Sequence, residues 1–181
     1  DYVKTLGKEE KEAYDSGVRS YGKLMELCDA FITSTTDLKN ELLKLGKPVY
    51  LNRNLASEEL ISISEQAIDK TIKKIKIGYF SGSITHNENF DLIRSAILKI
   101  LKEFPQTELH LVGHLTIPDE MKNYKKQLIV HDFLDWTLLP SLVAEMDINL
   151  APLVDNVFNR AKSEIKWLEA ALVGVTTVAS D

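Results

Sequence analysis

The fold class is decided by one segment near the end of the chain, Phe158-Asn-Arg-Ala-Lys162-Ser-Glu-Ile-Lys166-Trp-Leu-Glu169-Ala-Ala-Leu-Val-Gly174-Val-Thr-Thr-Val-Ala-Ser180. Lys162 and Lys166 are four residues apart, so a continuous helix would place them on one face, and Glu169 continues that face toward the helix C-terminus. Gly174 is expected to end this helix, and the β-branched run at residues 175–178 predicts a buried strand.

This order of residues suits a phosphate and a sugar hydroxyl at once. Two cations at a helix start, a carboxylate two turns later and a parallel strand behind them are typical of a nucleotide site in an open α/β sheet. The segment alone also allows a plainer interpretation, in which the lysines and Glu169 are solvated charges on an amphipathic helix. The rest of the chain decides between the two.

Strands and helices alternate upstream of this segment, starting at Ile75. The predicted strands lie at 75–80, 108–112, 127–131 and 147–151. Between them are a helix that begins at a capping box, Thr85 to Glu88, and ends before Pro105, a short helix at 118–125 and a helix at 138–146. This alternation predicts an α/β fold with a doubly wound parallel sheet, whose ligands bind at the carboxyl ends of the strands.

Residues 1–54 form a separate, smaller pattern. They predict a charged helix at 8–28, then a strand, a helix capped near Thr35 and a second strand, a set too small for its own core. We interpret residues 1–54 as the tail of an earlier α/β domain, 55–74 as a connector and 75–181 as the main domain. Because the chain starts at Asp1 and stops directly after a predicted strand, we expect a fragment of a longer protein.

Composition excludes several classes of function. The chain has 181 residues with 44% hydrophobic and 27% charged residues, which is ordinary for a globular protein. A net charge of −5 argues against a nucleic-acid surface. No apolar run reaches the roughly 20 residues needed to span a bilayer. The single cysteine excludes an intramolecular disulfide and fits a reducing compartment, so we expect a cytoplasmic protein.

The loops at the carboxyl ends of the predicted strands hold the candidate ligand contacts. Ser81, Gly82 and Ser83 follow the first strand, and their small side chains would let backbone N–H groups approach an anion. His86 follows at the predicted helix start, and Gly113 with His114 ends the next strand. A plain strand–helix turn and a capping histidine remain alternatives for these positions.

No metal or cofactor is predicted. The four histidines lack metal-ligand spacing and one cysteine cannot build a thiolate zinc site. His110 alternates with leucines inside a strand and is interpreted as structural. A Walker lysine loop, a nucleophile elbow and a dinucleotide fingerprint are all missing from the sequence.

With these residues assembled, the chain resembles the GT-B glycosyltransferases of family 4, the group 1 glycosyltransferases, and within them a bacterial subgroup of polysaccharide or O-antigen synthesis. The resemblance rests on four stretches: Ser81 to Phe90, Val112-Gly113, Asp147 to Leu153 and Phe158 to Ser180. It implies a Rossmann-like C-terminal donor-binding domain, truncated at its C-terminus, and a small piece of the N-terminal domain at 1–54.

The resemblance implies a role for each candidate. Glu169 would bind the ribose hydroxyls, and Lys162, as the catalytic residue, would neutralise the departing diphosphate. The loop at 81–83 would face the diphosphate, and main chain near Phe133 and Leu134 would meet the nucleobase. The remaining donor-binding candidates are Asn159 and Ser163, near the sugar or phosphates, and His86, Gly113, His114 and Lys166.

The implied activity is transfer of a sugar from a nucleoside diphosphate to a glycan acceptor, with retention. Ala161 stands where the family's E-x7-E motif has its first glutamate, so a non-catalytic nucleotide-binding or scaffold module of a larger synthase is the alternative. We expect the fragment alone to be inactive. Association with the inner face of the membrane, through regions outside this sequence, is left open.

Overall fold

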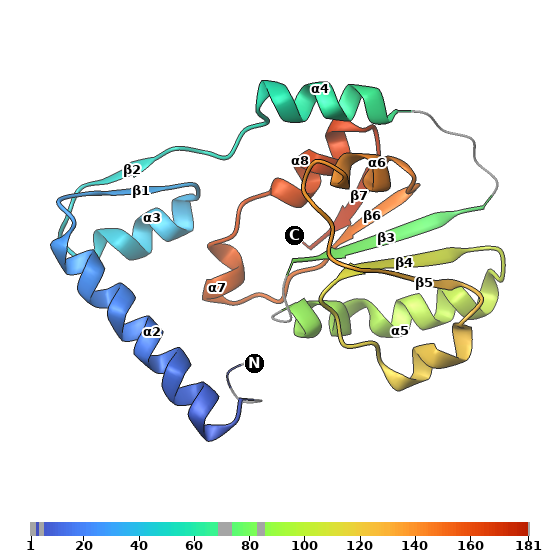
Figure 1. Cartoon of the computed structure of the whole chain (residues 1–181), viewed down its shortest axis with the longest axis horizontal. Helices are drawn as coiled ribbons and strands as arrows, with labels where there is room; N and C mark the ends of the chain where they lie inside the picture. Colours follow the sequence, from blue (N-terminus) through green and yellow to red (C-terminus); the bar gives the residue numbers. More distant parts are fainter. Residues whose placement is uncertain (1–2, 4–5, 69–73, 83–85, 181) are drawn as a thin grey trace. The chain divides into compact units, whose positions relative to one another are not determined.

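The chain folds into two compact units, which are described one at a time (Figure 1). The computed structural model describes residues 3, 6–68, 74–82 and 86–180. Unit 1 comprises residues 1–54 and 156–163, and unit 2 comprises residues 55–155 and 164–181. The predicted domain borders after residues 54 and 74 stay predictions.

Unit 1 is a small α/β element built around two parallel strands. Its elements are α2 (Lys8–Leu27), β1 (Phe31–Thr33), α3 (Thr36–Leu43), β2 (Val49–Leu51) and α7 (Val157–Arg160). Phe31 of β1 lies opposite Val49 of β2. The hydroxyl of Thr35 accepts a hydrogen bond from the N–H of Leu38 at 3.3 Å, so the predicted cap of α3 is formed.

A lysine closes the C-terminus of α2. The Lys47 ammonium donates hydrogen bonds to the carbonyls of Met25 (3.0 Å), Glu26 (2.6 Å) and Cys28 (2.6 Å). The last turn of α2 contains no basic residue of its own. Lys47 therefore supplies the cation that the negative end of the helix dipole favours, and it ties the start of β2 to α2.

Unit 2 contains a five-stranded sheet in which every strand is parallel to its neighbours. The strand order is β5-β4-β3-β6-β7, with β3 (Lys76–Ser81), β4 (Glu108–Gly113), β5 (Leu128–His131), β6 (Ile148–Ala151) and β7 (Thr176–Ala179). The chain starts at the central strand β3, winds to β4 and β5 on one side, and then to β6 and β7 on the other. The predicted doubly wound α/β fold is confirmed.

Helix α5 (Asn87–Glu103) covers one face of this sheet (Figure 1). Alternate strand residues point to it, because successive side chains of a strand face opposite sides. Tyr79 and Phe90 meet there edge to face, with ring centroids 4.9 Å apart. The 3-10 helix η2 (Asp119–Tyr124) packs on the same cluster, whose buried members are Ile77, Tyr79, Phe90, Ile97, Leu101, Leu109, Leu111, Met121 and Leu150.

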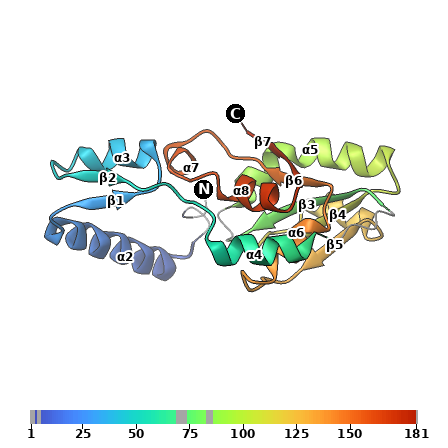
Figure 2. The same cartoon turned by 90° about the horizontal axis from the view of Figure 1, so that it is seen from above.

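Three helices cover the opposite face (Figure 2): α4 (Glu58–Ala67), α6 (Leu139–Ala144) and α8 (Ile165–Leu172). Their shared cluster is built from small and flexible side chains, with Val143, Ala144, Met146, Ala170, Val173 and Val175 buried. Gly78 of β3 is a glycine because a Cβ there would press on Phe80 and Met146. The two clusters sandwich the sheet and leave the carboxyl ends of its strands free to build a site.

Strand β7 corrects one prediction. The run from Val175 to Val178 was expected to be a buried strand, but β7 lies at the sheet edge and Val178 is 56% exposed. Pairing with β6 alone leaves one side of β7 open, and only Val175, ahead of the strand, is buried. Gly174 ends α8 as predicted, with φ of 71° and a hydrogen bond from the Val175 N–H to the Ala170 carbonyl (2.9 Å), a Schellman closure.

The single helix expected to carry Lys162, Lys166 and Glu169 is also corrected. It is two helices, α7 and α8, separated by residues 161–164. Unit 1 holds the break: the Thr35 hydroxyl donates to the Ala161 carbonyl (3.0 Å), and the Asn54 amide donates to the Ser163 hydroxyl (2.7 Å). These bonds involve groups that a continuous helix would use or bury, so Lys162 and Lys166 do not share one helical face.

Within the described ranges, no helix combines the length and apolar character that crossing a membrane requires.

The carboxyl ends of β3 and β4 are locked together by backbone and side-chain hydrogen bonds. The His114 N–H donates to the Ser81 carbonyl (3.2 Å), and the Ser81 hydroxyl donates to the His114 carbonyl (2.6 Å). Gly113 lies between them with φ of 81°, and a Cβ at this position would collide with the Ser81 carbonyl. Glycine is therefore required here both by backbone conformation and by space.

Gly113→Ala should lower the free energy of unfolding of unit 2 by at least about 2 kcal/mol, since a positive φ costs about 1–3 kcal/mol and the close approach adds overpacking strain. Both tryptophans, Trp136 and Trp167, belong to unit 2, so urea unfolding followed by tryptophan fluorescence reports on it. Gly82→Ala is the matched control, because a Cβ at Gly82 meets nothing within 4 Å. Equal stability losses in the two variants would contradict this account of Gly113.

Candidate functional site

A pocket of about 380 Å³ opens at the carboxyl ends of β3 and β4, within unit 2. Its wall is completed by the loop after β5 and by the first turns of α8. Parallel α/β sheets bind ligands at this edge. The lining residues are Phe80, Ser81, Gly82, Val112, Gly113, Phe133, Leu134, Asp135, Trp136, Leu139, Ile165, Lys166 and Glu169.

The structure gathers seven of the sequence-predicted residues in this one pocket. They come from four separate parts of the chain and are Ser81, Gly82, Gly113, Phe133, Leu134, Lys166 and Glu169. Their chemical roles stay predictions. Their convergence shows that the chain brings a cation, a carboxylate, small loop residues and aromatic surface to one place.

The floor of the pocket is the locked end of β3 and β4. The Ser81 side chain is buried and donates to the His114 carbonyl, so it fixes the backbone there. Gly82 follows at an exposed position with open space around its Cα. Backbone at this point is close to the pocket and unobstructed by side chains, which is the arrangement that an anion-binding loop needs.

Aromatic side chains of the loop after β5 form one wall. Phe133 is 65% exposed and Trp136 is 50% exposed, although both line the pocket. The ring of His114 lies nearly parallel to that of Phe133, with centroids 5.9 Å apart. Such exposed aromatic faces can stack on a flat ring, because stacking favours offset parallel geometry. His114 lies outside the pocket lining and contacts it through Phe133.

Helix α8 supplies the charged pair of the pocket. Lys166 and Glu169 are three residues apart on this helix, so they lie on one face. Burial raises the pKa of the Glu169 carboxyl, and the nearby Lys166 charge partly offsets that effect. The Lys166 ammonium also lies 5.3 Å from the centre of the Tyr79 ring, within cation–π range. A half-buried carboxylate beside a cation suits hydroxyl and phosphate groups.

Lys162, Asn159 and Ser163 belong to unit 1 and not to the unit that contains the pocket. Lys162, predicted to lie near a helix start, is found in the break between α7 and α8, shortly before α8 begins, and its catalytic role stays a prediction. Its ammonium is 4.5 Å from the centre of the Phe158 ring. Burial lowers the pKa of Lys162. Asn159 is buried in α7, whose N-terminus is capped by the Asn156 side chain.

His86 occupies the N-cap position of α5 and is buried. Its carbonyl accepts a hydrogen bond from the Tyr79 hydroxyl (3.0 Å), and its Nδ1 lies 3.2 Å from the Asn89 amide nitrogen. His86 is not among the residues that line the pocket, and its side chain makes no cap hydrogen bond to α5, so its donor-binding role stays a prediction. Ser83 and Thr85, and with Thr85 the predicted capping box, lie outside the described residues.

Several pocket residues were missed by sequence reasoning. Asp135 and Trp136 follow a predicted strand, and that position was the available signal for them. The Asp135 carboxylate accepts hydrogen bonds from the N–H (2.9 Å) and the hydroxyl (2.5 Å) of Thr137, which shape the loop. Leu139 and Ile165 line the pocket from the starts of α6 and α8, and no local pattern marks them.

Metal-ligating side chains are scattered in the described part of the chain, where no three or more His, Cys, Asp or Glu residues group in a way that could hold an ion. Among the described residues that line the pocket, Lys166 carries the positive charge that an anionic ligand could meet. The prediction that no protein-bound metal takes part stays a prediction.

Three solved structures illustrate the similarity of fold. S. aureus TarM, solved with fondaparinux, α-GlcNAc-glycerol and UDP, aligns with a TM-score of 0.59 at 12% identity over 90% of this chain and 32% of that chain. The pneumococcal O-GlcNAc transferase GtfA, solved with UDP and GlcNAc, gives 0.57 at 17% identity over 84% and 30%. Sucrose-phosphate synthase from Thermosynechococcus elongatus gives 0.61 at 13% identity over 98% and 47%.

These likenesses establish the GT-B type of fold, and the chain spans about a third to a half of the length of these proteins. No curated protein sequence matches the chain significantly. A profile of the family "Glycosyl transferases group 1" matches residues 75–181, which include the whole sheet and every residue of the pocket. The chain belongs to the group 1 glycosyl transferases.

Proposed function

We propose that this chain forms the donor-binding part of a glycosyltransferase, which binds a nucleoside-diphosphate sugar and transfers the sugar to a glycan acceptor with retention. The observation that carries the proposal is the pocket at the carboxyl ends of β3 and β4, inside the region that matches the family. The two solved structures of similar fold that hold UDP support a nucleotide as its ligand. Membership of the polysaccharide or O-antigen subgroup and a cytoplasmic location belong to the same proposal.

The pocket offers one chemical partner for each part of a nucleotide. The aromatic loop at 133–136 provides ring surface for the base, and Glu169 provides a carboxylate for ribose hydroxyls. Lys166 and the backbone at Gly82 provide positive potential for the phosphates. Bonds from charged groups are the stronger class of hydrogen bond, so Lys166 and Glu169 would contribute most to orienting the donor.

Catalysis would come mainly from stabilising the departing diphosphate. Negative charge develops on that group as the glycosidic bond to it breaks, and preorganised cations and N–H donors lower the barrier. The family resemblance assigns this role to Lys162. A non-catalytic nucleotide-binding module is the competing proposal, favoured by Ala161 at the position of the motif glutamate. Turnover of a labelled nucleotide sugar by the full-length protein separates the two.

Nucleotide binding should be visible as thermal stabilisation of the full chain. A panel of UDP, GDP and dTDP, each with its sugar conjugates, should contain at least one ligand that raises the unfolding temperature. At 100 times its Kd such a ligand adds about 2.7 kcal/mol to the stability of the folded state. UMP, which lacks the second phosphate, tests the contribution of the diphosphate, and free GlcNAc tests whether a sugar binds without the nucleotide. If none of the panel shifts the transition, the donor-binding proposal is wrong.

Glu169→Gln should remove the preference for ribose. We expect the variant to bind UDP about 10-fold more weakly or worse, because a hydrogen bond to a charged group is worth about 1.5–3 kcal/mol. It should bind 2′,3′-dideoxy-UDP as the parent protein does. Isothermal titration of both ligands against both proteins gives the four dissociation constants from which the coupling between Glu169 and the ribose hydroxyls is calculated. Equal losses for the two ligands would show that Glu169 does not contact the ribose.

Lys162→Ala, made in the full-length enzyme, should lower kcat by more than about 100-fold while the Kd for UDP changes less than about threefold, since an interaction made in the transition state affects turnover and not ground-state binding. Lys166→Ala is the informative comparison, because a pocket cation should change the Kd for UDP as well. Unchanged turnover in Lys162→Ala would remove the catalytic role from this residue.

A further inference from the structure

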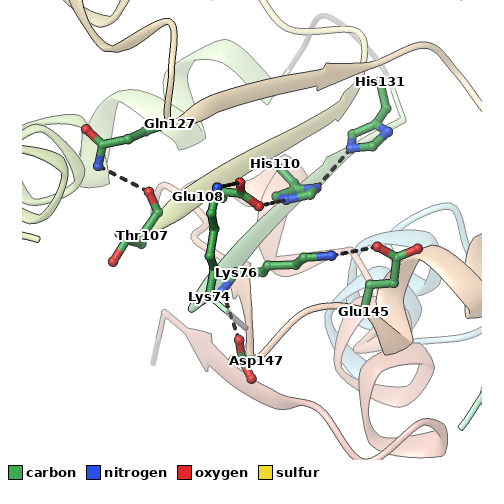
Figure 3. Close-up of polar contacts among 9 residues, drawn as sticks. All are labelled: Lys74, Lys76, Thr107, Glu108, His110, Gln127, His131, Glu145 and Asp147. Carbon is green, nitrogen blue, oxygen red and sulfur yellow. Dashed lines mark hydrogen bonds and ion pairs between the residues drawn. The ribbon is translucent and has the colours of Figure 1, made fainter. Parts of the chain in front are cut away.

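Two histidines on neighbouring strands of unit 2 form a hydrogen-bonded pair (Figure 3). Nδ1 of His110, on β4, lies 2.9 Å from Nε2 of His131, the last residue of β5. Their rings are stacked, with centroids 5.1 Å apart and planes 20° from parallel. His110 is only 4% exposed. One nitrogen must donate and the other accept, so the bond requires that at least one ring is neutral.

The charged groups drawn with this pair come from β3, from β4, from the segment before β3 and from the connection between α6 and β6 (Figure 3). Glu108, two residues before His110 on β4, places Oε2 3.5 Å from Nε2 of His110. That contact lies at the long end of hydrogen-bond distances, and through it the Glu108 carboxylate favours the protonated form of the His110 ring. Glu108 itself pairs with Lys74 (2.6 Å), while Lys76 of β3 pairs with Glu145 beyond α6 (2.8 Å). Asp147, before β6, accepts from the Lys76 backbone N–H (2.8 Å).

Burial is the largest influence on His110 and lowers its pKa. The Glu108 carboxylate opposes this shift, whereas His131 and Lys76 add to it. A lowered folded-state pKa means that the unfolded chain takes up the proton first as pH falls. The stability from neutral His110 is therefore present above about pH 6.5, the ordinary value, and is lost as pH falls through the folded-state pKa.

The pair lies at the base of the aromatic wall of the pocket. Val112 opposite His131 is the last registered position between β4 and β5. The chain leaves the sheet directly after His131, and residues 133–136 of the following loop all line the pocket. The hydrogen bond between His110 and His131 therefore joins β4 to the last residue of β5, and the pocket loop starts directly after that residue.

Acid breaks this hydrogen bond by protonating two residues that do not line the pocket. When both rings carry a proton, both facing nitrogens are donors and both rings are cations, so the bond is replaced by repulsion. The side-chain bond between β4 and the end of β5 is then lost, and the loop after His131 loses one of the interactions that position its start. The negative charge of Glu108 partly offsets the repulsion between the two cationic rings, but Glu108 faces Nε2 of His110 and not the nitrogen that faces His131.

We propose that His110 and His131 are a positioning pair, which holds the loop 132–136 in its nucleotide-binding arrangement and releases it when acid protonates both rings, so that affinity for the nucleoside diphosphate falls at acid pH. The proposal rests on the function proposed above. It adds regulation of that pocket by residues that do not line it.

A ligand-independent experiment tests the pair first. In the full chain with Trp167→Phe, Trp136 is the sole tryptophan and reports on the loop. Its emission should show a reversible transition below about pH 6.5, the ordinary range of histidine. His131→Phe preserves the ring stack but cannot titrate, so the transition should vanish. Glu108→Gln removes the carboxylate that favours protonation of His110, so the transition should move to lower pH.

Two further variants keep the outcome decisive. His131→Gln offers a smaller neutral hydrogen-bonding side chain, and it should also lack the transition if His131→Phe does not fold. Val130→Thr changes an exposed residue of β5 next to the pair and should behave as the parent protein does. A Trp136 transition that is absent from the parent, or that persists unchanged in the folded His131 variants, would overturn the proposal.

The functional arm measures the Kd for UDP by calorimetry at high and low pH. Between about pH 7.5 and pH 5.5, affinity should fall by at least about tenfold in the parent protein and by less than about threefold in His131→Phe. Protonation of Glu169 would weaken both proteins alike, so the difference belongs to the pair. If UDP does not bind even at pH 7.5, GDP and dTDP replace it. Failure of all three contradicts the donor-binding function, and the Trp136 transition alone then decides on the pair.

Discussion

The close pairing of β3 and β4 at their carboxyl ends is the constraint on which the site depends. Ser81 and Gly113 are opposed in register, and the positive φ of Gly113 lets the chain turn away directly after the ladder. The reciprocal bonds between Ser81 and His114 then fix both exits from the sheet. The fixed position of His114 also supports the loop after β5, because the His114 ring stacks on Phe133 of that loop. A single tight backbone contact thus sets the floor of the pocket and supports one wall.

The charged groups of the pocket, Lys166 and Glu169, lie on α8, and burial there costs Glu169 part of its hydration. Burial disfavours the ionised form of Glu169, and Lys166 compensates only in part. A ligand that donates hydroxyl groups to Glu169 and offers anionic oxygens to Lys166 would satisfy both groups better than the pocket does alone. The donor proposed above has hydroxyls next to phosphates, which would suit these polar walls, and a flat ring, which would suit the aromatic loop.

Local patterns predicted the parts of the fold that depend on neighbouring residues. The strands of unit 2, the cap of α3 by Thr35 and the end of α8 at Gly174 follow from alternation, a capping side chain and glycine's tolerance of positive φ. The errors depend on distant residues. The break after α7 is held by Thr35, which is 126 positions from Ala161 in the chain. The histidine bond and the exposed edge of β7 likewise follow from which strands become neighbours, which periodicity alone does not reveal.

The break between α7 and α8 divides the family motif between two compact units. Its first half, with Asn159, Lys162 and Ser163, is held by hydrogen bonds inside unit 1, while its second half supplies Lys166 and Glu169 to the pocket of unit 2. Under the proposed roles, nucleotide binding would rest on unit 2, and the chemistry assigned to Lys162 would depend on the folding of unit 1. Loosening unit 1 would then be expected to affect turnover, and loosening the loop after β5 to affect affinity. Sequence adjacency within a motif does not by itself imply a shared role.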